Sequence, residues 1–438
     1  MKHLKLLPIT LAVGSVLGSA PLLAATDAEI DALTQRIQEL EKKVETDYVY
    51  QQQSIDLPPD VEVPKGIIFS GYARYGNAYA SSDERMVNAY GALNGNATGR
   101  LGNENYGGEF QLGKVLKSDK GAVWDLVLMV DHYQDRTWWE AGSTEADGGL
   151  NVKKMYAGVT NLFESQPSLY FWGGRDFHQR TATDLNDYFW VTHDGQGGGF
   201  KNLDLGFGEF NLSFVGQVDD DMVGDNGRYA ITSKLHDIDL GGASLNIYAN
   251  YGFASDTIEE RDSRDVKSYQ LAGELMMNGQ RLVVRYGDNA KDSAFDLVDD
   301  EQAFLVSVDG FYQVTPKASF AYVAAYQSLD VADDQDRSNY NINLRPGYAW
   351  DDVNSTWVEL GYSLVDYDKI DATNKAWKVT VSQNITFGPF MSSRPMLRFY
   401  ATFGNSDNEF AGYADDEVTI TTSDNDTVTV GAMFEAWW

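Results

Sequence analysis

The stretch VTVGAMFEAWW (residues 428–438) alternates between two kinds of side chain at a period of two. One face carries Val428, Val430, Ala432, Phe434, Ala436 and Trp438. The opposite face carries Thr429, Gly431, Met433, Glu435 and Trp437. A period of two is that of a β-strand, in which successive side chains point to opposite sides of the sheet. The stretch therefore predicts a strand with one apolar face and one face that bears a charge.

The same alternation recurs throughout residues 67–438. In AVWDLVLMVDHY (122–133), Trp124, Leu126 and Leu128 share a face, and Asp125 and Asp131 lie on the other. Eighteen or nineteen such runs can be counted, including those at 105–113, 153–162, 200–206, 209–217, 243–253, 267–276, 279–287, 302–311, 318–328, 338–347, 355–367, 375–387 and 395–404. Strands of about ten residues separated by turns or loops are typical of a transmembrane barrel.

Two architectures could contain these strands. A soluble sandwich or propeller would bury the apolar faces, whereas a transmembrane barrel would turn them toward lipid around a polar lumen. The second faces carry Arg74, Glu109, Asp125 and Glu435, which a dry core would not hold unpaired. Aromatic residues gather near the strand ends, and a closed barrel leaves no unpaired edge in lipid. We therefore predict an all-β fold, an antiparallel transmembrane β-barrel of about eighteen strands.

The first 25 residues differ from the rest of the chain. They combine a basic start with a short apolar run and small residues, and the acidic TDAEID follows. This pattern predicts a secretory signal peptide over residues 1–25 rather than a membrane anchor, because the apolar run is short and interrupted. The chain has no cysteine, so an exported protein of this size must gain its stability from a large core or a closed sheet.

Residues 26–47 predict a short coiled-coil helix. The apolar positions follow the a/d spacing of a heptad and are Ile30, Leu33, Ile37, Leu40 and Val44. A single amphipathic helix lying on a surface is the alternative. Fewer than three heptads are unstable alone, so the coiled coil makes sense where something else already holds the chains together. Residues 48–66 contain three prolines and predict an extended linker.

The formal charge of −31 limits the kinds of molecule that the protein can bind. Nucleic acid is excluded as a partner, because its phosphate backbone requires a basic face. The acidic clusters at 219–221 and 299–301 are expected to be solvated loops, and structural calcium or cations that bridge lipopolysaccharide are the alternative. No other cofactor is expected.

Several motifs resemble the maltoporin family of trimeric outer-membrane sugar porins. They occur in the same order and are GYARYG (71–76), RLGNE (100–104), WWEAGS (138–143), GRDFHQR (174–180), DYFW (187–190), LGFG (205–208), SRP (393–395) and the terminal WW. The resemblance covers residues 67–438. It implies an eighteen-stranded barrel, a homotrimer, contact with lipid and lipopolysaccharide of the bacterial outer membrane, and a third loop, at about 176–198, that folds inward. Residues 26–47 resemble the periplasmic extension of the sucrose-porin and β-glucoside-porin branches.

The resemblance also implies a column of aromatic side chains that stack on sugar rings. Tyr72 and Trp437 match two of its positions and are expected to face the lumen, with generic lumen packing as the alternative. Trp139 matches a second-loop tryptophan that reaches into a neighbouring subunit's entrance, and Trp138 could take that role. Both tryptophans could instead belong to the interfacial girdle or to the trimer contact.

Three other positions of this aromatic column depart from the family. They are Gly107, Leu282 and Ser392, where the family has aromatic residues. Tyr106 shares its face with apolar residues and is expected to contact lipid. Tyr133 and Tyr156 are candidates for rebuilding the column.

The charged lumen positions of the family are better preserved. The matching residues are Arg74, Arg100, Glu109, Lys153, Arg180 and Asp187, with Phe189 and Thr192 at the positions of a constriction tyrosine and aspartate. Arg180 and Asp187 could bind sugar hydroxyls, or form a salt bridge that holds the loop. Replacement of the tyrosine and aspartate predicts a differently shaped and less polar constriction.

The histidines and glycines near the third loop suggest catalysis at first sight. His178 and His193 flank no serine or cysteine nucleophile motif, and GQGGGF (195–200) lacks the ending of a phosphate loop. No catalytic residue or catalytic metal is expected. We predict a channel for passive diffusion of oligosaccharides of the maltodextrin, sucrose or glucoside class. A general porin on the same scaffold is the main alternative, and a barrel enzyme or adhesin is a third.

Overall fold

The computed structural model describes residues 64, 66–82, 85–134, 150–218, 225–256, 258, 263–331, 335–370, 372–388, 393–414 and 417–438. The expected signal peptide and coiled coil, and nearly all of the linker, lie outside these residues. Within them, no helix is long and apolar enough to cross a membrane. The strands are β1 Ile68–Ala80, β2 Tyr106–Lys117, β3 Val123–Gln134, β4 Asn151–Thr160, β5 Tyr170–Asp176, β6 Thr181–Thr183, β7 Tyr188–Val191, β8 Gly195–Asp204, β9 Glu209–Val218, β10 Asp225–Asp239, β11 Ser244–Ala254, β12 Lys267–Met277, β13 Gln280–Asp288, β14 Gln302–Gln313, β15 Ala318–Asp330, β16 Arg337–Ala349, β17 Asn354–Tyr367, β18 Ala372–Thr386, β19 Met396–Ala414 and β20 Glu417–Trp437.

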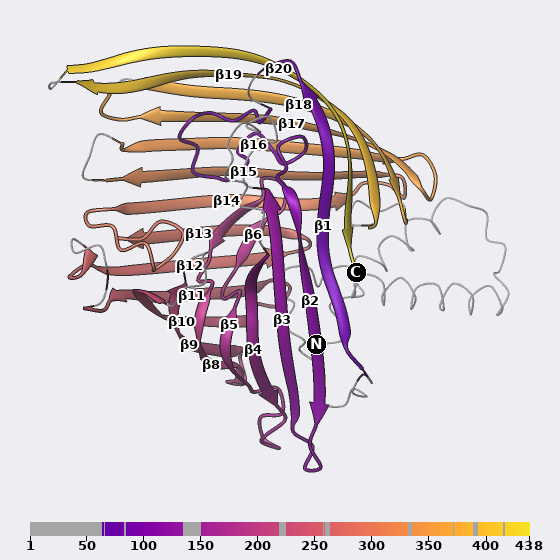
Figure 1. Ribbon diagram of the computed structural model, residues 1–438, viewed down its shortest axis with the longest axis vertical. Coiled ribbons are helices and arrows are strands. Elements are labelled where there is room, and N and C mark those ends of the chain that lie inside the picture. The colour runs from indigo at the N-terminus through magenta and orange to yellow at the C-terminus, as the bar shows by residue number, and fades with distance from the viewer. Residues whose placement is uncertain are drawn as a thin grey trace.

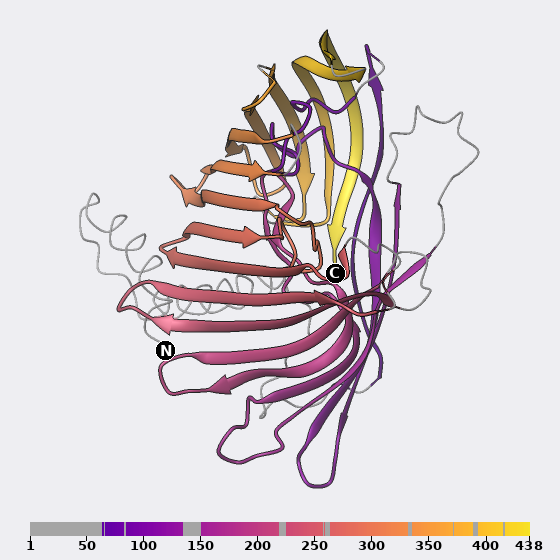
Figure 2. The same ribbon diagram turned by 90° about the vertical axis from the view of Figure 1, so that its left-hand side faces the viewer.

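Eighteen strands form one antiparallel sheet that closes on itself (Figures 1 and 2). Each strand pairs with the next along the chain, except that β6 and β7 form a separate two-stranded sheet and β5 pairs with β8. Pairing of β1 with β20, in which Tyr72 lies opposite Trp437, closes the ring. The predicted barrel of about eighteen strands is confirmed. Most connections at one end are short turns and most at the other are longer loops. The short turns of outer-membrane barrels face the periplasm.

Burial along the strands is the reverse of that in a soluble protein. On β16, Tyr340 and Ile342 are exposed on the outside, whereas Asn341 and Asn343 are buried on the inside. The other strands repeat this pattern, so exposed apolar residues form the outer surface and polar residues line the interior. This is the arrangement that lipid outside and water inside require.

The connection between β1 and β2, L1 (residues 81–105), folds into the barrel against β16 and β17. Asn94 donates a hydrogen bond to Asn341 over 2.7 Å, and the backbone N–H of Leu101 donates to Glu359 over 2.9 Å. Figure 1 shows this indigo segment lying across the interior side of β15–β17. The sequence analysis had not identified L1 as a structural part of the lumen.

The connection between β5 and β8, L3 (residues 177–194), also folds inward and carries β6 and β7. His178 pairs with Thr232 of β10 over 2.6 Å, and the Tyr188 hydroxyl donates to Gln327 of β15 over 3.1 Å. Trp190 is fully buried in an apolar cluster with residues of β11–β14. Burial of such a side chain contributes about 2–3 kcal/mol, which helps to hold L3 against the wall.

L1 and L3 meet inside the barrel. The N–H of Asn96 donates to the carbonyl of Asn186, and the N–H of Arg100 donates to the carbonyl of Leu185, each over 2.7 Å. Together the two loops form a continuous layer along the inner wall from β10 round to β19. The open part of the lumen therefore lies against the opposite wall.

Candidate functional site

A cavity of about 440 Å³ occupies the open part of the lumen. One side is formed by L3 and the end of L1, and the other by the wall from β1 to β11. Its lining is mostly polar and charged, and includes Tyr72, Arg100, Glu109, Lys154, Asp176, Phe177, Arg180, Asp184, Asp187, Phe189, Lys201, Asn211, Lys234 and His236. The cavity thus brings together residues that are far apart in the sequence.

Tyr72 and Trp437 form an aromatic pair at the seam between β1 and β20. Their ring centroids are 6.5 Å apart and the rings are within 25° of parallel. The Arg394 guanidinium lies over the Trp437 ring, 4.3 Å from its centroid. Both aromatic residues lie on the inner face of the sheet, as the alternation of the two strands predicts.

The carboxylate of Glu435 lies at the centre of a buried charged group, called here the Glu435 cluster. Arg394 and Arg398 approach its Oε2 to 2.6 and 3.2 Å, and Arg100 approaches its Oε1 to 3.4 Å. The hydroxyl of Tyr72 donates to the same carboxylate over 2.9 Å. Glu104 also pairs with Arg398, so these three cations and two anions leave one excess positive charge at this side of the lumen.

The tip of L3 is held against that basic side by two carboxylates. Asp187 accepts two hydrogen bonds from Arg74, over 3.0 and 3.1 Å. Asp184 approaches Arg100 to 3.3 Å and Arg345 to 3.8 Å, while most of its side chain remains exposed to the lumen. Asp187 therefore holds the loop tip in place, and Asp184 exposes a carboxylate to solutes in the lumen.

The Arg180 guanidinium is enclosed by two rings of L3. It lies 3.9 Å from the centroid of Phe177 and 4.4 Å from that of Phe189. Glu109 and Asp194 lie 3.9 and 3.6 Å from its nitrogens. A planar cation stacked on aromatic faces is held in a fixed orientation. Arg180 and Phe189 thus form one rigid unit of the lumen wall, next to Glu109 of β2.

A bulge in β4 changes the expected position of its lysines. The register between β3 and β4 shifts near Met129 and Val130, so two consecutive lysines point inward. Lys153 lies 3.8 Å from Asp131, and the buried Lys154 lies 3.5 Å from Asp176. The family resemblance pointed to Lys153, and strict alternation cannot place the neighbouring Lys154 on the same face.

The comparison with known families identifies the barrel. The model of the LamB porin family matches residues 67–438. This chain belongs to the LamB porin family. Among solved structures, outer-membrane-expressed OmpT of Vibrio cholerae is 10% identical, with 86% of this chain and 100% of that chain covered and a TM-score of 0.42. An anion-selective porin from Comamonas acidovorans is 13% identical, with 84% and 99% covered and a TM-score of 0.43. These likenesses are too distant to inform the site.

In this LamB porin Tyr133 of β3 lies against the glycine at the second-strand aromatic position. Gly107 pairs with Tyr133 across β2 and β3, and a Cβ at position 107 would overlap the Tyr133 ring. Gly107 therefore leaves room for Tyr133 to lean over the inner face of β2. The ring lies in the electrostatic surroundings of Glu109 and Arg74, beside Tyr72.

Two expectations for the aromatic column are wrong. Tyr106 does not contact lipid: it is buried against Tyr400 and under the Arg85 guanidinium, because β1 and β2 separate beyond Arg74 and the first residue of β2 turns inward. Leu282 is not a lumen position, since it lies exposed on the outer face of β13.

The remaining predicted site residues are distributed as follows. Thr192 donates its N–H to the carbonyl of Asp292, over 3.2 Å, and does not line the cavity. Trp138, Trp139 and Ser392 lie outside the described residues. The stacking and constriction roles assigned to the other residues stay predictions.

The two histidines of L3 have structural partners. Nε2 of His193 accepts a hydrogen bond from the N–H of Ala294 in L6 (residues 289–301), which connects β13 to β14. Burial lowers the pKa of His193 to about 3, so the ring is neutral and remains an acceptor at neutral pH. His178 uses Nε2 to pair with Thr232. The LamB family and the barrel fold indicate a channel rather than an enzyme, and these contacts agree with that reading.

L6 is expected to loosen as the pH rises. Burial, with the nearby Asp296 carboxylate, raises the pKa of Glu301 from 4.5 to about 7. The folded loop then binds this proton more tightly than the unfolded chain does, so its stability falls between about pH 4.5 and pH 7 and stays low above. Proteolysis within L6 should be faster at pH 8 than at pH 5.5. In Glu301→Gln, which mimics the protonated acid, this difference should be lost; an unchanged difference would assign it to another group.

Proposed function

We propose that this LamB porin allows passive diffusion of oligosaccharides across the outer membrane. The Tyr72–Trp437 pair carries the proposal, because Tyr72 lines the lumen cavity together with arginines and carboxylates. A sugar ring is apolar on its faces and polar around its edge. Aromatic faces bind the former and charged groups hydrogen-bond the latter, so one wall of this cavity offers both kinds of contact.

Movement through such a channel requires several weak sites rather than one strong site. Each site must bind well enough to dehydrate the sugar partly, and weakly enough to release it to the next. Tyr133, Tyr72 and Trp437 supply stacking surfaces on neighbouring strands, and Asp184 and Asp187 supply acceptors from L3. The solute gradient is the driving force, and no covalent step is involved.

A general porin for small solutes is the second candidate. The aromatic column of the maltoporin resemblance is interrupted, because Gly107 has no ring and Leu282 faces outward. With fewer stacking sites, the channel would bind sugars weakly and select by size and charge.

Sugar titration of single-channel conductance separates the two candidates. Oligosaccharides should reduce the ion current of the native channel in a concentration-dependent manner. Trp437→Ala should weaken this block about tenfold, or about 1.4 kcal/mol, because it removes one stacking surface. Trp377→Ala is the matched control, since Trp377 is exposed on the outer face of β18. Absence of block by any maltodextrin, sucrose or glucoside in the native channel would favour the general porin.

The assembly belongs to the same proposal. We place the barrel in a homotrimer, with lipid and lipopolysaccharide around it and residues 26–47 in the periplasm near the trimer axis. The a/d spacing of that segment and the maltoporin resemblance support this arrangement. The acidic segment at 299–301 remains a candidate for structural calcium.

A further inference from the structure

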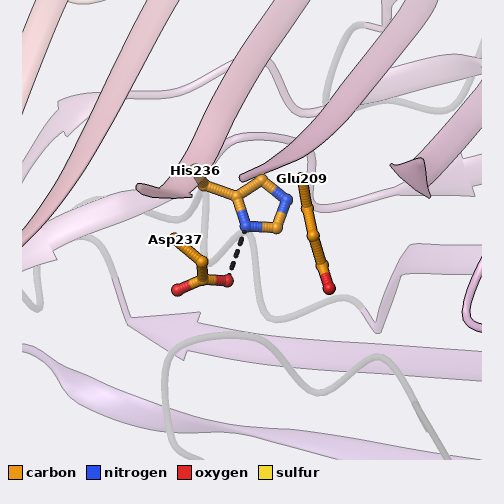
Figure 3. Close-up of side chains that lie close together, drawn as sticks. All are labelled: Glu209, His236 and Asp237. Carbon is orange, nitrogen blue, oxygen red and sulfur yellow. Dashed lines mark hydrogen bonds and ion pairs between the residues drawn. The ribbon is translucent and has the colours of Figure 1, made fainter. Parts of the chain in front are cut away.

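A second site lies at the short-turn end of the lumen, on β9 and β10. Glu209, His236 and Asp237 each offer a ligand atom, and these atoms all lie within 4.8 Å of one another. His236 and Glu209 are directly opposite in the antiparallel register. Figure 3 shows the imidazole of His236 between the two carboxylates, with a dashed line to Asp237. All three residues line the lumen cavity, so an ion in the pore can reach them.

A bulge in β10 brings the histidine and the aspartate together. Consecutive strand residues normally point to opposite faces, but the register of β10 against β11 shifts between Leu235 and Ile238. His236 and Asp237 occupy that shift, and both therefore line the cavity. The N–H of Asp237 donates to Asn246 over 3.0 Å, which fixes the bulge. Bulges that re-aim a side chain are frequent beside functional sites.

Both ring nitrogens of His236 face oxygen atoms. Its Nδ1 lies 2.8 Å from a carboxylate oxygen of Asp237, and its Nε2 lies 3.0 Å from Oδ1 of Asn211. The backbone N–H of Asn202 donates to that same Oδ1 over 2.7 Å, so the atom is an acceptor and not the amide nitrogen. A neutral imidazole has one N–H and can satisfy one of these oxygens. In either neutral tautomer one nitrogen lone pair faces an oxygen, and a second proton or a metal ion is needed to satisfy both contacts.

We propose that Glu209, His236 and Asp237 bind a divalent transition-metal ion, of which Zn²⁺ is the best match. One imidazole nitrogen and two carboxylates form a ligand set that zinc accepts, and the open side toward the cavity leaves room for water as the fourth ligand. Calcium and magnesium prefer oxygen ligands alone, so the histidine disfavours them. Neighbouring ligand atoms of tetrahedral zinc are about 3.3 Å apart. This lies between the 2.8 Å from His236 to Asp237 and the 4.8 Å within which all three ligand atoms lie.

A bound ion would alter transport from the short-turn side. It would make the charge at this end of the passage more positive, and it would reduce the free cross-section of the lumen. Cation flow would therefore decrease. The proposed metal site requires the barrel and its lumen. It does not require that sugar is the transported solute.

The test is Zn²⁺ binding by the purified full-length chain in detergent, measured by calorimetry, together with conductance in planar bilayers. Zn²⁺ should bind in the native protein and reduce cation conductance more strongly when added on the short-turn side. His236→Asn and Glu209→Gln should each weaken binding at least tenfold. Asp237→Asn should do the same without disturbing the bulge, because asparagine tolerates the positive φ of 55° at this position.

His132→Asn, on β3, is the matched control and should bind Zn²⁺ like the native protein. Equal Zn²⁺ binding by the native protein and by His236→Asn would overturn the proposal. It would also be overturned if Zn²⁺ had no effect while acidification changed the conductance through His236, because the missing cation would then be a proton.

Discussion

Replacing Glu435 with glutamine should destabilise the barrel by about 3–5 kcal/mol, which is the cost of removing one partner from a buried charged group. Glu435 is 1% exposed, and it is the shared anion of Arg100, Arg394 and Arg398. Glutamine keeps the size of the side chain and one acceptor oxygen. The measured loss of stability therefore reports the removal of the negative charge. Three guanidinium groups would then lie close together, with Glu104 the nearest anion to Arg398.

The measurement is urea unfolding of the protein in lipid vesicles, followed by tryptophan fluorescence. Asp407→Asn is the matched control, because Asp407 forms an exposed ion pair with Lys375 and should change the free energy of unfolding by less than about 0.5 kcal/mol. The double variant Glu435→Gln, Arg394→Met should be less destabilised than the sum of the single changes, since one of the unpaired cations is removed. A loss below about 1 kcal/mol in Glu435→Gln would show that lumen water screens the cluster.

The sequence predicts the barrel well because its signal is local. Lipid on one side and water on the other require alternation along every strand, and VTVGAMFEAWW shows this without knowledge of any other strand. The orientation of Tyr72, Arg74, Glu109 and Trp437 follows from the same alternation, and the structure places all four on the inner face.

The site is predicted less well, because it depends on departures from alternation and on contacts between distant loops. A bulge turns Lys154 inward beside Lys153, and another brings His236 and Asp237 to one face. Neither is visible as a period in the sequence. Tyr106 was misplaced because the pairing of β2 with β1 stops at Gly107, one residue before it is reached.

The contacts of the inward loops cannot be predicted from the sequence, for a different reason. L1 packs against strands that follow it by more than two hundred residues, through single hydrogen bonds such as that from Leu101 to Glu359. Its composition, rich in glycine and asparagine, is that of an ordinary surface loop. Only the antiparallel closure of the barrel brings these segments together.

Replacing Glu359 with glutamine should detach L1 from the wall and thereby disturb the channel. Glu359 is fully buried and binds Arg345 over 2.6 Å and Lys378 over 3.3 Å, while it accepts the N–H of Leu101. Loss of its charge removes the nearest anion of both buried cations, with only Asp184 left 3.8 Å from Arg345, at a cost of about 3–5 kcal/mol. The least costly response is for L1 to move away from them.

The L3 tip rests on L1 through the bonds to Asn96 and Arg100, so both loops should shift into the passage. Single-channel recordings of Glu359→Gln should show lower mean conductance and frequent brief closures. Asp366→Asn is the matched control, because Asp366 lies on the same strand but is exposed on its outer face. If Glu359→Gln is destabilised in urea yet conducts steadily at the native level, then L1 does not support the L3 tip, and the contacts of L3 with β10–β15 are sufficient to hold the constriction.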